Sequence, residues 1–339
     1  MGPGAPCYVI AEAGVNHNGD MGLARELVDV AAEIGADAVK FQSFSAKRLA
    51  TATAPKAAYQ KRTTGAGESQ LEMLQRLELS EAGHRELLSH CEGRGVTFLS
   101  SPFDEPSADL LSGLGVPALK VPSGELTNLP FLRHAARTGL PLIVSTGMAT
   151  LAEVEAAVDA VAEGGDPGLV LLHCVSNYPA DPADVNLRAM DTLAAAFGVP
   201  VGYSDHTEGA AVSLAAVARG ACVIEKHFTL DRSLPGPDHQ ASLEPDELAA
   251  LVREIRTVER ALGDGRKKPT AAEADTARVA RKSLVAARDL AAGAVLASAD
   301  LAVSRPGTGL APAMREAVVG RTLRSALEAG DVVTREVLV

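Results

Sequence analysis

The sequence contains no tryptophan, and only 3% of its residues are aromatic. A lectin-type platform, on which sugars stack against indole rings, is therefore not predicted. The sequence also lacks a run of about 18 consecutive apolar residues, the length that a membrane-spanning helix needs. No basic stretch followed by an apolar segment and a small-residue cleavage site opens the chain, so no signal peptide is expected. The expected compartment is the cytoplasm, with no membrane partner.

Cysteine is scarce, and its four copies never approach the Cys-x-x-Cys spacing of structural zinc sites. Each copy lies in an apolar, strand-like or helical context. We therefore expect reduced, buried thiols at Cys7, Cys91, Cys174 and Cys222.

Basic residues are outnumbered by acidic ones, and the formal net charge is −11. Residues 1–262 contain 20 lysines and arginines against 34 acidic residues, whereas residues 263–339 contain 12 against 9. An acidic body repels phosphate backbones, so nucleic acid is not an expected partner.

The apolar residues gather in eight short, β-branched runs with helical segments between them, the longest over residues 70–94. Near-continuous apolar strands that alternate with helices are typical of a parallel sheet covered by helices. Eight such units in about 260 residues predict a closed (β/α)8 TIM barrel over residues 1–262. The runs are Tyr8–Ala13, Ala38–Phe44, Val96–Ser101, Ala118–Ser123, Pro141–Ser145, Leu169–Val175, Val199–Ser204 and Cys222–Phe228.

The composition changes after Leu262. Residues 263–282 are polar, lack an apolar face and contain glycine and proline, so we expect a linker. Residues 283–339 return to short apolar runs and contain a weak repeat, AGAVL at 292–296 and AGDVV at 329–333. This pattern predicts a small, pseudo-symmetric all-β domain. Between the copies, Arg305 stands beside a Pro-Gly turn, which fits a recognition loop and an ordinary exposed turn equally well.

Polar residues collect where the predicted strands end. In a barrel these positions face one mouth, where such enzymes place their chemistry. Several of them are lysines and histidines inside apolar runs, where burial without a partner is costly, so solvent exposure alone does not explain them. The residues are Glu12, Asn16, His17, Lys40, Gln42, Ser100, Ser101, Lys120, Ser123, Glu125, Ser145, Thr146, His173, Ser176, Asn177, Tyr178, Ser204, Asp205, His206, Glu225, Lys226 and His227.

Two of these histidines, His206 and His227, end the seventh and eighth predicted strands and can converge on one ion. With oxygen donors nearby and no thiolate pattern, the ligand set suits Mn²⁺, Mg²⁺, Co²⁺ or Fe²⁺ with water in the open positions. A single histidine in an apolar run is more often a hydrogen-bonded core residue. The paired placement favours a metal site.

Two lysines, Lys40 and Lys120, sit inside strands near serines of the same mouth. Such lysines and hydroxyls can cradle a phosphate or a carboxylate. A lysine at a barrel mouth could instead form a Schiff base, as in an aldolase. The serines of this cradle are Ser101, Ser123, Ser145 and Ser204, and the acids available for proton transfer or sugar orientation are Glu12, Glu125, Glu225 and Asp238.

Nine motifs follow one another along nearly the whole chain. They are AEAGVNHNGD (11–20), KFQ (40–42), SSPFD (100–104), KVPSGELTN (120–128), STGM (145–148), HCVSNYP (173–179), GYSDHT (202–207), EKHFTLDRSLPGPDH (225–239) and SRPGTG (304–309). Together and in this order they closely resemble the motifs of the sialic acid synthase family. Residues 283–339 resemble the antifreeze-like (SAF) domain, a β-clip fold, of those enzymes.

The resemblance implies condensation of phosphoenolpyruvate with an open-chain N-acylated amino-mannose, which gives a nine-carbon 2-keto acid and, by C–O cleavage, phosphate. It implies a divalent ion, typically Mn²⁺, on His206 and His227, where the ion polarises the sugar aldehyde. It assigns phosphoenolpyruvate to the lysine and serine cradle. The further roles that it implies are catalysis by Glu12, Lys120, Glu125, His206 and His227, and sugar contacts from Gln42, Asn177, Tyr178, Asp238 and Arg305.

Enzymes of this family form a domain-swapped homodimer, so the resemblance places Arg305 in the barrel mouth of a second copy, reached by the arm at 263–282. The third strand ends Ser-Ser-Pro where many relatives have Ser-Thr-Pro, and this keeps a hydroxyl. The loop TTGAGES (63–69) has no asparagine, whereas some relatives place a sugar-contacting asparagine there. The exact sugar therefore stays open at this point.

N-acetylmannosamine is the first expected sugar, and the 6-deoxy-2,4-diacetamido sugar of legionaminic acid synthesis is the alternative. The sequence Ser-Gly-Glu at 123–125 speaks against the pseudaminic acid branch. Two other hypotheses compete with the synthase. One is a pyruvate aldolase that uses Lys40 or Lys120, and the other is a non-enzymatic ice-binding or partner-binding module at 283–339.

Overall fold

The eight apolar runs form eight parallel strands in the computed structural model, which describes residues 2, 4–64 and 67–339. Hydrogen bonds join the strands in the order β3-β2-β1-β8-β7-β6-β5-β4, and β3 and β4 contact each other, so the barrel is nearly closed. The predicted TIM barrel is confirmed. The strands are β1 (Tyr8–Gly14), β2 (Ala38–Ser43), β3 (Thr97–Pro102), β4 (Leu119–Val121), β5 (Leu142–Ser145), β6 (Leu169–Cys174), β7 (Val201–Asp205) and β8 (Val223–His227).

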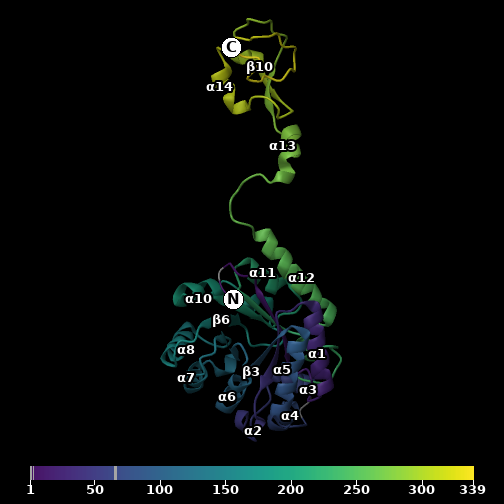
Figure 1. Ribbon diagram of the computed structural model, residues 1–339, viewed down its shortest axis with the longest axis vertical. Coiled ribbons are helices and arrows are strands. Elements are labelled where there is room, and N and C mark those ends of the chain that lie inside the picture. The colour runs from purple at the N-terminus through teal and green to yellow at the C-terminus, as the bar shows by residue number, and fades with distance from the viewer. Residues whose placement is uncertain (1, 3, 65–66) are drawn as a thin grey trace. The chain divides into compact units, whose positions relative to one another are not determined.

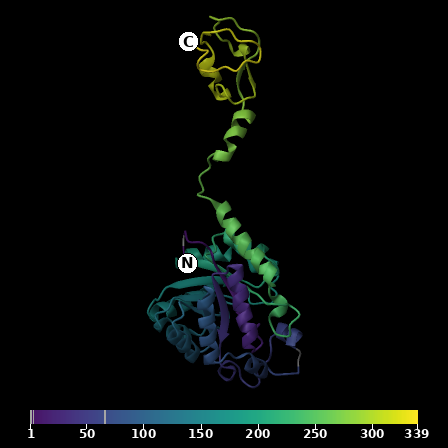
Figure 2. The ribbon, with the colours of Figure 1, turned by 45° about the vertical axis from the view of Figure 1, so that its right-hand side comes forward.

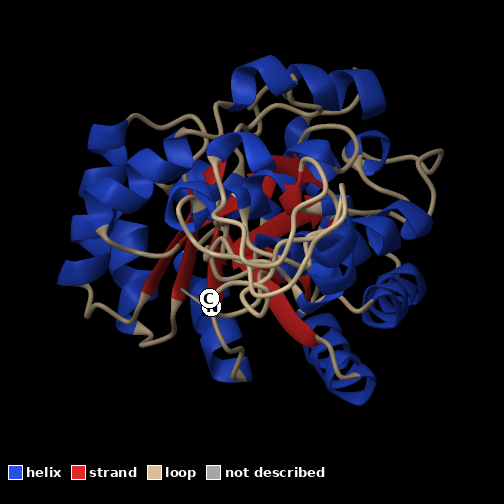
Figure 3. Cartoon of the chain, turned by 90° about the horizontal axis from the view of Figure 1, so that it is seen from above, coloured by secondary structure: helices blue, strands red, loops and turns tan. Residues whose placement is uncertain are grey.

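Helices cover the outside of the strands, which Figure 3 shows in blue around red. Helix α12 packs beside α1, as Figures 1 and 2 both show. No described helix is long and apolar enough to cross a membrane. The covering helices are α1 (Met21–Ile34), α5 (Glu81–Arg94), α6 (Glu105–Leu114), α7 (Leu129–Arg137), α8 (Leu151–Glu163), α10 (Ala189–Phe197), α11 (Ala211–Ala218) and α12 (Pro245–Leu262).

Helix α1 illustrates how the sequence sets these helix ends. The Asp20 side chain accepts hydrogen bonds from the backbone N–H groups of Gly22 and Leu23, which caps the first turn. Gly35 ends the helix with φ 80°, a left-handed conformation that glycine adopts without a side-chain clash. The chain can then reverse directly into β2.

Two apolar layers lie on the two faces of the barrel strands. Alternate residues point to opposite faces, so Val9 and Ala11 pack outward against the helices while Ile10 points inward. The inner layer consists of Ile10, Ala38, Leu99, Ala118, Ile143, Leu172 and Val223. Of the four free cysteines, Cys7, Cys91 and Cys174 are buried, and Cys222 is partly exposed.

The segment between β2 and β3 carries three extra helices, α2 (Ala46–Leu49), α3 (Ala58–Thr64) and α4 (Gln70–Leu77). The prediction of a single helix over residues 70–94 is wrong. Helix α4 ends at Leu77, and the Ser80 side chain then accepts a hydrogen bond from the Gly83 N–H and caps a separate helix, α5. This N-cap signal outweighed the continuous helical periodicity.

The chain divides into two compact units, Met1–Gly263 and Asp264–Val339. In the second, the antiparallel strands β9 (Ser283–Ala286) and β10 (Leu301–Ser304) confirm the expected small β domain. Its core includes Leu296 and Val333, one residue from each copy of the weak repeat. The second unit also contains α13 (Ala274–Ala280), which lies in the segment expected to be a linker, and α14 (Arg315–Val318).

Candidate active site

The polar site residues stand two positions beyond the apolar inner layer of the barrel. Side chains two residues apart along a strand share a face, so Ile10 is followed by Glu12, and Ala38 by Lys40. Two positions further on comes an outer ring that holds Gln42, Ser176, His206 and His227. The polar ring above the apolar layer consists of Glu12, Lys40, Ser101, Lys120, Ser145, Cys174, Ser204 and Glu225.

These two rings line one pocket of about 440 Å³ at the carboxyl ends of the strands. Because the eight strands are parallel, every predicted strand-end group is delivered to the same side of the barrel. The predicted site residues in its lining are Glu12, Lys40, Gln42, Ser101, Lys120, Ser123, Ser145, Tyr178, Ser204, His206, Glu225, His227 and Asp238.

Two lysines and two carboxylates form a buried network at the base of the pocket. The Nζ atom of Lys40 lies 2.8 Å from Glu12 Oε2 and 3.8 Å from Glu225 Oε2, and it donates to Ser101 Oγ at 2.8 Å. The Nζ atom of Lys120 lies 3.6 Å from Glu225 Oε1. Each buried charge therefore has an opposite charge close by, as burial requires.

Burial shifts the pKa values in this network unequally. It raises the pKa of Glu12 to about 7, and the adjacent Lys40 only partly opposes the rise. The pKa of Lys120 is lowered by burial, which outweighs the attraction of Glu225. Glu12 thus has the pKa that a general acid or base needs near neutral pH.

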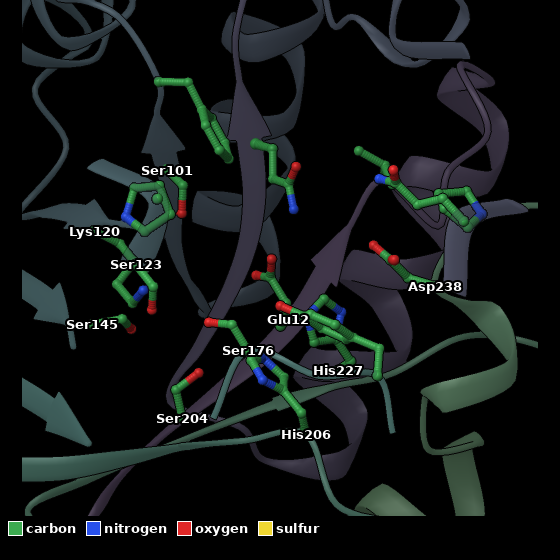
Figure 4. A pocket seen from close by; sticks show the side chains of 18 of the residues that line it. Glu12, Ser101, Lys120, Ser123, Ser145, Ser176, Ser204, His206, His227 and Asp238 are labelled. Carbon is green, nitrogen blue, oxygen red and sulfur yellow. The ribbon is translucent and has the colours of Figure 1, made fainter. Parts of the chain in front are cut away.

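The two histidines lie next to each other, with ring centroids 5.5 Å apart (Figure 4). His206 Nδ1 donates to the Val175 carbonyl oxygen at 2.7 Å, which leaves the lone pair on Nε2. His227 Nδ1 is buried and has no hydrogen-bond partner among the described residues. Burial lowers the pKa of His227 well below its usual value, so its ring is neutral, as a metal ligand must be.

The residues around the histidine pair fit a divalent ion held by two imidazoles and oxygen donors. The described residues contain no cluster of three or more His, Cys, Asp or Glu side chains in metal-binding geometry. A site built on His206 and His227 therefore needs water or substrate oxygens to complete its shell, which is typical of a catalytic rather than a structural ion.

Asp238 is buried in the pocket wall, and its Oδ1 atom has no hydrogen-bond partner among the described residues. Burial raises its pKa to about 6 from 3.8. The native state therefore holds a proton that the unfolded chain has lost between these pH values, so this group lowers stability as pH rises through them.

We expect Asp238→Asn to stabilise the metal-free enzyme at pH 8 by up to about 3 kcal/mol, because asparagine cannot ionise. Thermal unfolding in EDTA at pH 8 and pH 4.5 measures this. The midpoint of the variant should exceed that of the wild type at pH 8, and the gap should shrink at pH 4.5. An equal gap at both pH values would show that ionisation of Asp238 is not the cause.

Of the strand-end residues expected at the mouth, Asn16, His17, Ser100, Thr146, His173, Asp205 and Lys226 do not line this pocket. Three residues with a predicted catalytic or sugar-binding role are also absent from its lining. Glu125 accepts a hydrogen bond from Asn128 Nδ2 at 2.8 Å, beside the start of α7. Asn177 is exposed, and Arg305 belongs to the second unit, where its Nε donates to the Ala280 carbonyl at 3.0 Å. Their predicted roles stay predictions.

The pocket also contains residues that sequence reasoning had not assigned to it. Helix α4 presents one face to the pocket through Gln70, Met73, Leu74 and Leu77, and the i, i+3, i+4, i+7 spacing could have revealed this face. Residues 65–66 of the loop without asparagine lie outside the described residues. Other additions include Val15, Leu49, Gln60, Phe103, Met148 and Cys174.

Comparisons with known proteins agree with the geometry. Residues 27–267 match the NeuB family, and residues 281–339 match the SAF domain. The chain is 53% identical to an N,N'-diacetyllegionaminic acid synthase of Legionella pneumophila, over 97% of this chain and 94% of the relative. It is 50% identical to the enzyme of the same name from Campylobacter jejuni, over 92% and 94%.

A solved structure adds to this evidence. The N-acetylneuraminic acid (sialic acid) synthetase of Leptospira borgpetersenii, in complex with citrate, is 37% identical, with a TM-score of 0.71 over 80% of this chain and 90% of that one. Its fold and the sequence matches point to one enzyme class. The chain belongs to the NeuB family of phosphoenolpyruvate-condensing synthases and carries a C-terminal SAF domain.

Proposed function

We propose that this enzyme condenses phosphoenolpyruvate with the open-chain 6-deoxy-2,4-diacetamido amino-mannose and releases N,N'-diacetyllegionaminic acid and phosphate. The relatives at 53% and 50% identity carry that product in their names, whereas the Leptospira sialic acid synthetase shares 37%. These values favour the alternative sugar over N-acetylmannosamine. The feature of the molecule that carries the proposal is an apolar wall on one side of the pocket.

The apolar wall is a separate hydrophobic cluster built by the loops after β1, β2 and β3. Its partly exposed members line the pocket, where they would contact a bound substrate. A 6-deoxy sugar ends in a methyl group that such a surface can cover. N-acetylmannosamine ends in a hydroxymethyl group, whose hydroxyl would lose water against these apolar side chains. The wall consists of Leu49, Leu74 and Phe103, supported by Val15, Phe44, Met73 and Leu77.

The distribution of charge also favours a sugar without a phosphate at C6. Among the described residues that line the pocket, the lysines are Lys40 and Lys120, and no arginine is present. Both lysines are engaged by Glu12 and Glu225 at the base of the pocket. Among the described residues of the barrel itself, a terminal phosphate against the apolar wall would therefore have no counterion, and burial of an unpaired charge is strongly unfavourable.

The histidine pair supports metal assistance at the sugar aldehyde. His206 and His227 would hold the ion, with Mn²⁺ as the expected metal and Mg²⁺ or Co²⁺ as substitutes. The ion would supply Lewis-acid polarisation of the carbonyl oxygen, which makes the aldehyde carbon a better electrophile. The chain's own contribution is to fix the two rings and to exclude solvent around them.

The lysines and serines support binding of phosphoenolpyruvate on one side of the histidine pair. In Figure 4, Ser101, Lys120, Ser123 and Ser145 lie to one side of His206 and His227, and Asp238 lies to the other. Ser145 Oγ is buried without a hydrogen-bond partner among the described residues, so it is available to an incoming oxyanion. This arrangement directs carbon 3 of phosphoenolpyruvate toward an aldehyde at the histidines, with the sugar chain extending toward Asp238.

Glu12 is the best-placed group to move a proton. Its Oε2 lies 2.8 Å from Lys40 Nζ, and Figure 4 shows its side chain near His227. Its pKa of about 7 lets it change protonation state in the working pH range. When an anion binds Lys40, Glu12 can take up a proton and so release the lysine. Among the two acids predicted as catalytic, the geometry therefore favours Glu12 over Glu125.

We also propose that Arg305 completes the sugar site from the C-terminal domain of a second copy in a homodimer. The basis is the resemblance of the SRPGTG turn, together with the basic balance of residues 263–339 beside an acidic barrel. Attraction between the basic C-terminal domain of one copy and the acidic barrel of the other would assist this domain swap.

Phosphate release from phosphoenolpyruvate, measured with Mn²⁺ and three sugars, tests the proposal. We expect kcat/KM for the 6-deoxy-2,4-diacetamido sugar to exceed that for N-acetylmannosamine by about 10- to 200-fold, the range for one well-placed group in a pocket. N-acetylmannosamine 6-phosphate should give no release. Equal or better turnover of N-acetylmannosamine would refute the assignment. The variant Leu74→Asn should reduce the ratio of kcat/KM between the 6-deoxy-2,4-diacetamido sugar and N-acetylmannosamine. It should leave the KM for phosphoenolpyruvate unchanged.

A further inference from the structure

A second buried ion pair lies behind the histidines, and neither of its residues lines the pocket. Lys226 Nζ is 2.9 Å from Asp205 Oδ2, and both side chains are at most 1% exposed. Each residue precedes one of the histidines in the sequence. Because neighbouring residues on a strand point to opposite faces, Asp205 and Lys226 face the helices while His206 and His227 face the pocket.

The two residues are direct partners across the last pair of barrel strands. The register of β7 and β8 sets Ser204 opposite Glu225 and Asp205 opposite Lys226. The histidines are the next residues along the two strands, beyond the last registered pair. The ion pair therefore joins β7 to β8 at the point where the ladder ends and the two metal-binding side chains begin.

The pair is anchored on every side by short hydrogen bonds. Asp205 Oδ1 accepts from both the N–H and the Oγ1 of Thr207 at 2.8 Å, and Asp205 Oδ2 accepts from Ser213 Oγ of α11 at 2.6 Å. Lys226 Nζ donates to the Thr207 carbonyl oxygen as well. The residues on both sides of His206 are thus tied to each other and to β8.

General stability does not explain why charges occupy these two positions. The other outward-facing residues of the same strands, Val201, Tyr203 and Ile224, belong to the apolar core. A buried ion pair contributes no more than apolar residues of similar size, and often less. What the pair adds is directional bonding, which fixes the distance between two strand ends in a way that apolar contacts do not.

We propose that Asp205 and Lys226 are positioning residues that set the separation and direction of His206 and His227 for a divalent cation. This inference rests on the proposed metal site. The link between the strands would hold the two rings at their present spacing before the ion arrives. Binding of the ion would then need no further ordering of the two rings, which lowers its free-energy cost. Loss of the link should therefore appear as weaker metal binding.

The double variant Asp205→Asn/Lys226→Met tests this without leaving a buried charge unpaired. The asparagine oxygen can still accept from Thr207, and its amide nitrogen can donate to Ser213 Oγ in place of the bond that the carboxylate accepted. Methionine fills the volume of the lysine stem, so the fold should be retained. We expect the Kd for Mn²⁺, measured by calorimetry or electron paramagnetic resonance on the full-length metal-free enzyme, to rise about 10- to 100-fold, as for other residues that orient metal ligands. The KM for phosphoenolpyruvate should change little.

Asp37→Asn provides a matched control at the opposite end of the barrel. Asp37 accepts from Val9 N and pairs with Arg256, so its loss should lower the unfolding temperature and leave the Kd for Mn²⁺ unchanged. A double variant that is folded and binds Mn²⁺ as tightly as the wild type would overturn the positioning role alone. A wild-type enzyme that binds no Mn²⁺ would instead overturn the metal site on which the inference rests.

Discussion

Replacing His227 with alanine is expected to abolish Mn²⁺-dependent condensation. The ring is buried, its Nδ1 has no partner among the described residues, and it stands beside His206 at the pocket. Without it, one imidazole remains, and the cation loses half of its proposed protein ligands. Loss of Lewis-acid assistance is worth several kcal/mol, so we expect kcat to fall by about 10³-fold or more. Phosphate release at saturating substrates measures the effect, and calorimetry measures the loss of Mn²⁺ binding.

His173→Gln is the matched control for His227→Ala. His173 lies on β6, which β7 separates from β8, and its Nε2 contacts the Val185 carbonyl oxygen at 2.6 Å, away from the pocket lining. A glutamine amide can make the same bond, so turnover and Mn²⁺ affinity should stay close to the wild-type values. If His227→Ala kept wild-type turnover and Mn²⁺ affinity, His227 would have to be removed from the ligand set.

Replacing Lys120 with methionine is expected to produce the second-largest loss. The lysine is buried next to Glu225, and Figure 4 shows it among the serines of the cradle. Methionine removes a charge that would face phosphoenolpyruvate, and it leaves the Glu225 carboxylate without its closer lysine. We expect kcat/KM for phosphoenolpyruvate to fall by about 10³-fold, with a much smaller change in the KM for sugar, since charge-assisted contacts in a dry site are strong.

The chemistry of Lys120 also distinguishes the synthase hypothesis from the Schiff-base aldolase hypothesis. The pKa of Lys120 is lowered, as it would be for a Schiff-base lysine, so its chemistry needs a direct test. Borohydride added to wild-type enzyme and pyruvate should leave Lys120 unmodified in peptide mass spectra. Trapping of pyruvate on Lys120 or Lys40, together with turnover that survives EDTA, would support the aldolase.

The fold and most of the site could be predicted from two sequence periods. Helical and strand runs alternate eight times, and polar residues appear two positions beyond inward apolar ones, as in Ile10 and Glu12. A parallel barrel turns that local rule into a global one, because all its strands deliver their last residues to one mouth. The family motifs then identified the chemistry, which spacing alone had left between a synthase and an aldolase.

The parts that sequence missed depend on tertiary packing. The side chains of α4 face the pocket only because α2 to α4 fold over the loops after β1 to β3, and the expected single helix over 70–94 hid this arrangement. Strand alternation also implies that Asp205 and Lys226 point away from the pocket, although they sit in clusters of pocket residues. Glu125 stands in a strand-end motif as well, but its carboxylate turns to Asn128.

We propose that the barrel mouth joins phosphoenolpyruvate to the diacetamido sugar with metal assistance and expels phosphate by C–O cleavage. Phosphoenolpyruvate with oxygen-18 in its C–O–P bridge tests this most directly, when metal-free enzyme is supplied with the sugar and then with Mn²⁺. We predict no product before the metal, and afterwards one labelled phosphate for each unlabelled nine-carbon acid. Oxygen-18 in the keto acid would contradict C–O cleavage, and phosphate release without sugar or metal would contradict metal-assisted condensation.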